Sequence, residues 1–159
     1  MTIAMLLAMA ASAALAQEPP APAPNPANAD YHFRFLNRLD PAQGWQRTQS
    51  GLRYRKLSGT ANGPRPSPAD TVTIHYAGRF IDGSEFDSSV SRGEPATFPL
   101  PRLIRGWQEG VPLMSVGDRY EFAIPYTLAY GWSGRGPIPG GATLIFTIDL
   151  IAIAPPSQE

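Results

Sequence analysis

VTIHYAGRFIDGSEFDSSVSRGEPATFPLPRLIRGW, residues 72–107, is the stretch of sequence that decides the fold. Its first residues alternate, with Val72, Ile74 and Tyr76 on one side and polar residues such as His75 on the other. Because successive side chains of a strand point to opposite faces of a sheet, this period predicts a strand with one buried face. Tyr76 is therefore expected on the core side, and His75 on the opposite face in a structural role.

A tight turn is predicted after this strand, at Asp82-Gly83, since this dipeptide suits the left-handed backbone of short hairpin turns. The chain then returns through a second apolar segment in which Asp87 stands beside Phe86. An acid next to a large aromatic is harder to explain as ordinary core than the aromatic alone. Asp-Ser-Ser also favours a local turn between side chain and backbone, and both roles are compatible.

A short helix is predicted from Pro101, which suits a first helical position, to Gly110, which suits a helix end. Between them Leu103, Ile104 and Trp107 recur at helical spacing and are expected on one face. A helix of this length is marginal in isolation. It must therefore be held by burying that face against a sheet.

The remaining periodic segments are also strands. Residues 52–57 alternate as a half-buried strand, residues 120–124 alternate up to a proline, and residues 144–150 place their large apolar residues on one face. Residues 128–141 contain five glycines and two prolines and are predicted to form a long loop. Antiparallel strands around one short helix define an α+β fold.

Composition excludes several functional classes. The chain of 159 residues has zero formal net charge and no cysteine, so a disulfide framework, a thiolate zinc site and a cysteine nucleophile are excluded. Only His32 and His75 are present, which argues against a histidine-rich metal site. No basic stripe indicates nucleic acid as a partner. We expect no cofactor and no metal.

The amino-terminal residues 1–16, MTIAMLLAMAASAALA, are almost wholly apolar and end in Ala14-Leu15-Ala16, which fits the small residues of a secretory cleavage site. The run is shorter than the ~20 residues that span a bilayer. We predict a signal peptide, and hence a secreted or periplasmic protein with no integral membrane segment after cleavage. No Lys or Arg precedes the apolar run, and an apolar anchor or core helix is the alternative.

Residues 17–44 are predicted to be a Pro/Ala-rich tether followed by a short segment. Residues 17–30 contain five prolines in 14 positions and are expected to stay extended. Residues 31–39 could form a short helix or an edge strand, which either docks on the domain or pairs two chains. The domain itself is assigned to residues 45–155, with a tail at 156–159.

Seven runs in this order resemble the FKBP-type peptidyl-prolyl cis-trans isomerases, over residues 51–153. Each run alone is weak evidence for the family, but seven runs in the same order are specific. Together with the predicted signal peptide, the resemblance suggests the secreted or periplasmic bacterial branch of the family. The runs are Val72–Gly78, Asp82-Gly83, Phe86-Asp87-Ser88-Ser89, Ile104–Gly110, Met114-Ser115-Val116-Gly117, Ala129-Tyr130-Gly131 and Ala142–Phe146.

The resemblance implies a half-wrapped antiparallel sheet of five to six strands around one short helix, with the active pocket between them. It implies catalytic roles for Tyr76, Asp87 and Tyr130, with the Ile104 N–H and the Tyr130 hydroxyl donating to substrate carbonyls and Trp107 as the floor. The substrate-binding residues it implies are Phe86, Phe98, Leu103, Ile104, Trp107, Ile138 and Phe146.

The implied activity is acceleration of Xaa-Pro isomerisation during the folding of exported proteins, whose proline-containing segments would be the partners. A macrolide that fills the pocket would inhibit it. Ala96, where the family often has an aromatic, and the loop at 131–141 depart from the family pattern and bear on substrate preference. The alternative is a non-catalytic chaperone or adaptor that holds proline segments. A carbohydrate-binding domain would need paired exposed acids or amides around the tryptophan, and none is seen.

Overall fold

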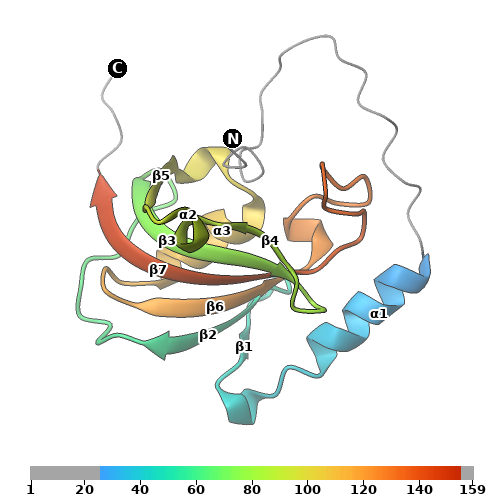
Figure 1. Cartoon of the computed structure of the whole chain (residues 1–159). Coiled ribbons are helices and arrows are strands. Elements are labelled where there is room, and N and C mark those ends of the chain that lie inside the picture. Colours follow the sequence, from blue (N-terminus) through green and yellow to red (C-terminus); the bar gives the residue numbers. More distant parts are fainter. Residues whose placement is uncertain (1–25, 155–159) are drawn as a thin grey trace.

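The structure of the chain is a computed structural model that describes residues 26–154, with side chains from residue 30 onward. The predicted signal peptide, most of the tether and the tail lie outside the described residues. Within residues 26–154 a single antiparallel sheet curves around a short helix, α3, with a longer helix, α1, at one end (Figure 1). The α+β class is confirmed.

Within residues 26–154 seven strands form the sheet, one more than the five to six that the resemblance implies, because the two-residue strand β1 and the four-residue strand β5 also join it. The order is β1-β2-β6-β7-β3-β4, with β5 paired to β3. The strands are β1 (Gln46–Arg47), β2 (Arg53–Ser58), β3 (Thr71–Phe80), β4 (Glu85–Ser88), β5 (Ala96–Pro99), β6 (Arg119–Ile124) and β7 (Leu144–Ala154).

Strand β3 organises the sheet because it pairs with three others. It runs antiparallel to β7 along its whole length, with β5 beside its first half and β4 beside its second half. The predicted alternation is confirmed, since Val72, Ile74 and Tyr76 are all fully buried. His75 lies on the other face, where its Nδ1 is 3.1 Å from the Ser89 hydroxyl. This contact fits the structural role expected for it.

The Asp82-Gly83 turn is present and joins β3 to β4. Gly83 has a φ of 90° and its N–H donates to the Phe80 carbonyl at 2.9 Å. The Asp82 carboxylate accepts hydrogen bonds from the hydroxyl and then the backbone N–H of Ser84, and these bonds lower the pKa of Asp82. The turn therefore uses both a glycine that tolerates positive φ and an acid that satisfies the next backbone donor.

The predicted helix between Pro101 and Gly110 is shorter than expected. Helix α3 covers Arg105–Gly110, and the residues before it form a separate 3₁₀ turn, η2 (Leu100–Arg102). Leu103 and Ile104 are therefore not helical, although both are buried beside Trp107 as predicted. Both side chains belong to the same core cluster as Trp107.

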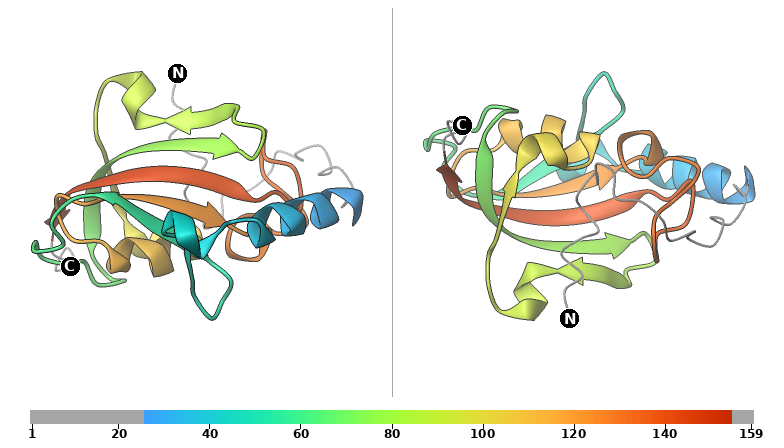
Figure 2. Two further views of the ribbon diagram at one scale, coloured as in Figure 1. Left: turned by 90° about the horizontal axis from the view of Figure 1, so that it is seen from below. Right: turned by 90° about the horizontal axis from the view of Figure 1, so that it is seen from above.

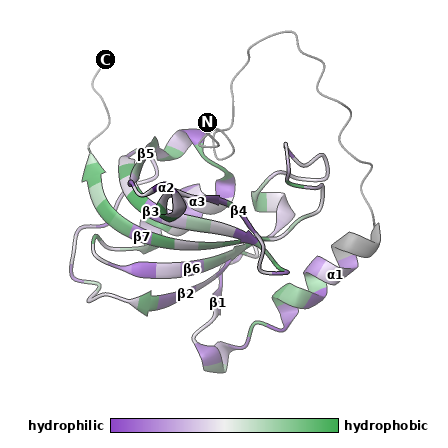
Figure 3. Cartoon of the chain, in the orientation of Figure 1, coloured by the Kyte–Doolittle hydropathy of each residue, from purple (hydrophilic) through white to green (hydrophobic). Residues whose placement is uncertain are grey.

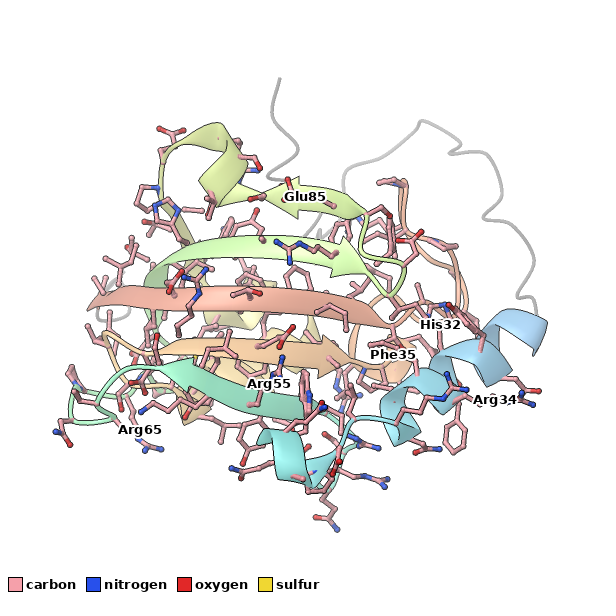
Figure 4. All side chains as sticks on the ribbon, turned by 60° about the horizontal axis from the view of Figure 1, so that its bottom comes forward. His32, Arg34, Phe35, Arg55, Arg65 and Glu85 are labelled. Atoms are coloured by element: carbon pink, nitrogen blue, oxygen red, sulfur yellow. The ribbon has the colours of Figure 1, made fainter. Side chains whose placement is uncertain are left out.

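The amino-terminal segment is a helix, α1 (Pro26–Asn37), which lies across the end of the sheet (Figures 1 and 4). The expectation that residues 26–30 stay extended is wrong, because Pro26 occupies a helix start, where its missing N–H costs nothing. Leu36 is buried with Trp45 and Ala123, so α1 docks on this domain. The remaining short helical elements are η1 (Pro41–Gln43), α2 (Ser89–Arg92), η3 (Val111–Leu113) and η4 (Tyr126–Leu128).

The core lies between α3 and the concave face of the sheet. The views from below and from above show α3 on one face of the sheet (Figure 2). Hydrophobic residues alternate with polar ones along the long strands (Figure 3). In β7 the buried members of this alternation are Leu144, Phe146, Ile148 and Leu150, as predicted. Among the residues that the structure describes, no helix is long and apolar enough to cross a membrane.

Docking of α1 depends on His32, whose Nδ1 accepts a hydrogen bond from the Thr143 N–H at 3.0 Å. Burial lowers the pKa of His32 below its ordinary value of 6.5, so the folded protein favours the neutral ring. Arg47 and Arg53 line, together with His32, a groove between α1 and the end of the sheet. The stabilisation by His32 is therefore fully present above about pH 6.5 and is lost as the pH falls below it.

We expect His32→Ala to lower the free energy of unfolding by about 1 to 3 kcal/mol at pH 7.5, since it leaves a buried N–H without an acceptor. Urea unfolding at pH 7.5 and 5.5 measures the effect. His32→Asn keeps an acceptor that does not titrate, so it should reduce the loss between these two pH values. An unchanged pH dependence in His32→Asn would contradict the assignment.

Candidate functional site

The centre of the site is a cluster of aromatic rings on the concave face of the sheet. Trp107 from α3 packs edge-on against Tyr76 and Phe146, with ring centroids 5.3 and 5.1 Å apart. Phe98 from β5 and Phe86 from β4 are half-buried and complete the cluster. The Phe86 ring packs edge-on against Phe146, with ring centroids 5.6 Å apart. These edge-to-face contacts put the positive edge of one ring against the negative face of the next.

Gly78 on β3 makes room for two of these rings. A Cβ at this position would lie 2.7 Å from atoms of both Phe86 and Phe146. Any side chain would therefore force the two rings away from the strand. Gly78 is therefore both a residue of strand β3 and the position that lets Phe86 and Phe146 pack against it.

A polar triad lies at one side of the rings. The Tyr76 hydroxyl donates to Asp87 Oδ2 at 2.6 Å, and Arg92 donates to both Asp87 Oδ1 and the Tyr76 oxygen. The Arg92 guanidinium also lies 5.6 Å from the centre of the Tyr76 ring. Burial, and then the hydrogen bond to Asp87, raise the pKa of Tyr76, so this phenol stays protonated.

Arg92 is the member of the site that the sequence did not reveal. It stands five residues after Asp87 at the end of α2, a helix of one turn that Ser88 caps through the Ser91 N–H. In the sequence, the only indication of its role is its position shortly after the Asp-Ser-Ser run. Without the three-dimensional fold, Arg92 could not be distinguished from the other arginines on the surface.

Two buried donors of the cluster have no hydrogen-bond partner among the described residues: the Trp107 indole N–H and the Tyr130 hydroxyl. Buried polar groups are normally satisfied by protein or water, so each unsatisfied one needs an explanation. Burial raises the pKa of Tyr130, which keeps the hydroxyl protonated as a donor. A ligand carbonyl is an acceptor that would satisfy either group.

The remaining predicted residues join the same core. Leu103, Ile104 and Ile138 are buried in it, and Tyr130 packs against it from the loop after β6. Ile104 is the N-cap residue of α3. The first N–H groups of a helix have no partner within the helix, which leaves this end of α3 suited to a carbonyl. In the described range 26–154 no group of three His, Asp or Glu side chains could hold a metal.

Comparison with known proteins accounts for this geometry. The family model of the FKBP-type peptidyl-prolyl cis-trans isomerases matches residues 63–151. The chain belongs to this family.

Within it, the chain is similar to bacterial FkpA proteins. It is 48% identical over 117 residues to FkpA of Aeromonas hydrophila, covering 74% of this chain and 43% of the relative. The crystal structure of FkpA from Escherichia coli superposes with a TM-score of 0.71 at 36% identity, covering 81% of this chain and 58% of that chain.

An isomerase structure from Pseudomonas syringae pv. tomato matches with a TM-score of 0.75 at 31% identity, over 83% of this chain and 97% of the other. The chain thus spans about half the length of the FkpA relatives and nearly all of this shorter one.

We expect Arg92→Gln to lower the free energy of unfolding by about 1 to 3 kcal/mol, because the buried Asp87 carboxylate loses its charged hydrogen bond. The Arg92 side chain is 28% exposed, so solvent screening places the effect near the lower end. Chemical denaturation measures it. Arg79→Gln removes an exposed arginine from the same sheet and should change stability little. Equal effects of the two variants would contradict the triad.

Proposed function

We propose that this protein accelerates the cis-trans isomerisation of Xaa-Pro bonds in polypeptides, with the aromatic cluster as the proline-binding site. The observation that carries the proposal is the pair of buried, unsatisfied donors of Tyr130 and Trp107 within a cluster of aromatic rings. Family membership supports it. The activity needs no nucleophile, metal or cofactor, since no covalent bond is broken.

The barrier to the reaction, about 18–20 kcal/mol, comes from the partial double-bond character of the amide. In the twisted transition state amide resonance is lost, and the carbonyl carries less charge than in the planar ground state. A site with little water therefore favours the twisted form relative to the planar one. In the proposed site the rings of Tyr76, Phe86, Trp107 and Phe146 hold the pyrrolidine by area and shape.

Fixed donors then hold the flanking carbonyls in a rotated geometry. The Tyr130 hydroxyl and the Ile104 N–H would bind carbonyls on either side of the twisting bond. Asp87 would lie near the carbonyl of that bond, held in one orientation by Tyr76 and Arg92. Phe98, Leu103 and Ile138 would complete the wall around the substrate.

We further propose that the protein acts on exported polypeptides, after a signal peptide at residues 1–16 directs it to the periplasm or outside the cell. The apolar run and the small residues at its end support this proposal. A protein-folding role suits the slow rate of uncatalysed proline isomerisation, tens to hundreds of seconds. A macrolide that occupies the aromatic cluster would act as a competitive inhibitor.

Tyr130→Phe should reduce turnover on a short Xaa-Pro peptide by about tenfold, the effect of one hydrogen bond of roughly 1 kcal/mol or more made in the transition state. Stability should not fall, because the hydroxyl has no partner among residues 26–154. The assay measures isomerase turnover on peptides with Leu, Phe or Ala before proline, with and without a macrolide. Tyr54→Phe removes a hydroxyl outside the cluster and is the matched control.

The proposal fails if Tyr130→Phe and Asp87→Ala both leave turnover unchanged in folded protein. If the folded parent chain shows no turnover but binds proline peptides, the site is a binding module without catalysis. Ala96 and the loop at 131–141 would then be the first positions to alter.

A further inference from the structure

A second groove, of about 220 Å³, lies where α1 meets the end of the sheet, and its walls come from distant parts of the chain. One wall is apolar and consists of Phe33 and Leu36 from α1 and Pro125 after β6. Figure 4 shows His32 on the side of α1 that faces the sheet and Arg34 on the side turned away. The groove is separate from the aromatic cluster, with which it shares no lining residue.

The other wall is cationic. Arg47 of β1 and Arg53 of β2 are directly paired in the strand register, and both line the groove. Arg53 is only 8% exposed, and its guanidinium donates to the Gly51 carbonyl at 3.0 Å. Neither arginine forms an ion pair with any residue that the structure describes. The Glu109 carboxylate accepts hydrogen bonds from the hydroxyl of Ser50, a residue that lines the groove.

A buried cation without a counter-charge is costly, and here a like charge adds to the cost. Burial, and then the charge of Arg47, lower the pKa of Arg53, although an arginine stays protonated at neutral pH. Among residues 26–154 the Arg53 guanidinium makes one side-chain hydrogen bond, to the Gly51 carbonyl, so other N–H groups of its five can bind a ligand. An anion in the groove would relieve the repulsion between the two arginines.

An independent observation points to the same groove. The Thr143 side chain is fully buried and lines it, and its hydroxyl has no hydrogen-bond partner among the residues described. Its backbone N–H is already bound to His32. A ligand that brings both an acceptor and a negative charge would satisfy Thr143 and the arginines together.

We infer that this groove binds the carboxyl-terminal residue of a polypeptide that ends in an apolar side chain. The free carboxylate would pair with Arg47 and Arg53, which can bind it bidentately. The preceding peptide group would meet the Thr143 hydroxyl, and the side chain would pack on Leu36 and Pro125. The groove has a volume of about 220 Å³. Pockets that hold a whole drug-sized ligand begin at roughly 300 Å³, so this groove suits the last residue of a chain better than a larger ligand.

The test is direct binding of a fluorescein-labelled peptide, Gly-Ser-Gly-Ala-Leu, which has a free carboxylate and contains no proline. Fluorescence anisotropy should give saturable binding, and amidation of the peptide should weaken it at least about tenfold. Replacing the last leucine by serine should weaken it as well. In an NMR titration the backbone amides of Thr143 and Gly51 should shift.

Two variants separate the groove from other anion sites. Arg47→Gln should weaken binding about tenfold, and Thr143→Val, which replaces the unpartnered hydroxyl by a methyl group, about fivefold. Thr143→Val should not lower the stability. Arg65→Gln, which removes an exposed arginine elsewhere, is the matched control and should bind like the parent chain (Figure 4).

Three outcomes would overturn the inference. The amidated peptide could bind as well as the free acid, inorganic phosphate could compete as strongly as the peptide, or Arg47→Gln and Thr143→Val could bind unchanged. Because binding is measured without a proline substrate, these outcomes do not depend on isomerase activity. A protein without isomerase activity could still bind the peptide, and an active isomerase could fail to bind it.

Discussion

The close approach of helix α3 to the sheet is the constraint on which the rest of the structure depends. Two glycines of the helix face the sheet, Gly106 against Ile124 and Gly110 against Phe122, and a Cβ at Gly110 would lie 2.7 Å from the phenylalanine ring. Six residues form no stable helix alone, so α3 exists only because it packs here. The absence of these two side chains lets Trp107 reach Tyr76 and Phe146.

The same contacts stabilise the core and build the site. Trp107 is 1% exposed, and burial of such a ring contributes a large share of the hydrophobic free energy. Its indole N–H and the Tyr130 hydroxyl lie in this core without partners among the described residues, an arrangement that costs stability. Natural sites commonly retain polar groups that a ligand, and not the protein, satisfies.

The first residues of the segment after β6 connect the aromatic cluster to the groove beside α1. Pro125 and Tyr126 line the groove, while Tyr130 belongs to the cluster, and the Gly131 N–H donates to the Tyr126 carbonyl at 2.9 Å. Trp132 packs on the Tyr126 ring with centroids 4.5 Å apart. The backbone that positions the Tyr130 hydroxyl therefore also forms a wall of the groove.

The sequence by itself determined the strands β2, β3, β6 and β7, the Asp82-Gly83 turn and the buried face of Tyr76, because a period of two and a turn dipeptide are local signals. Motif order also identified the aromatic residues that the fold brings together. Only the tertiary structure decided the start of α3 at Arg105, the docking of α1 and the pairing of Arg92 with Asp87. Each of these depends on which surfaces and side chains meet in space, and such contacts leave no periodic trace in the sequence.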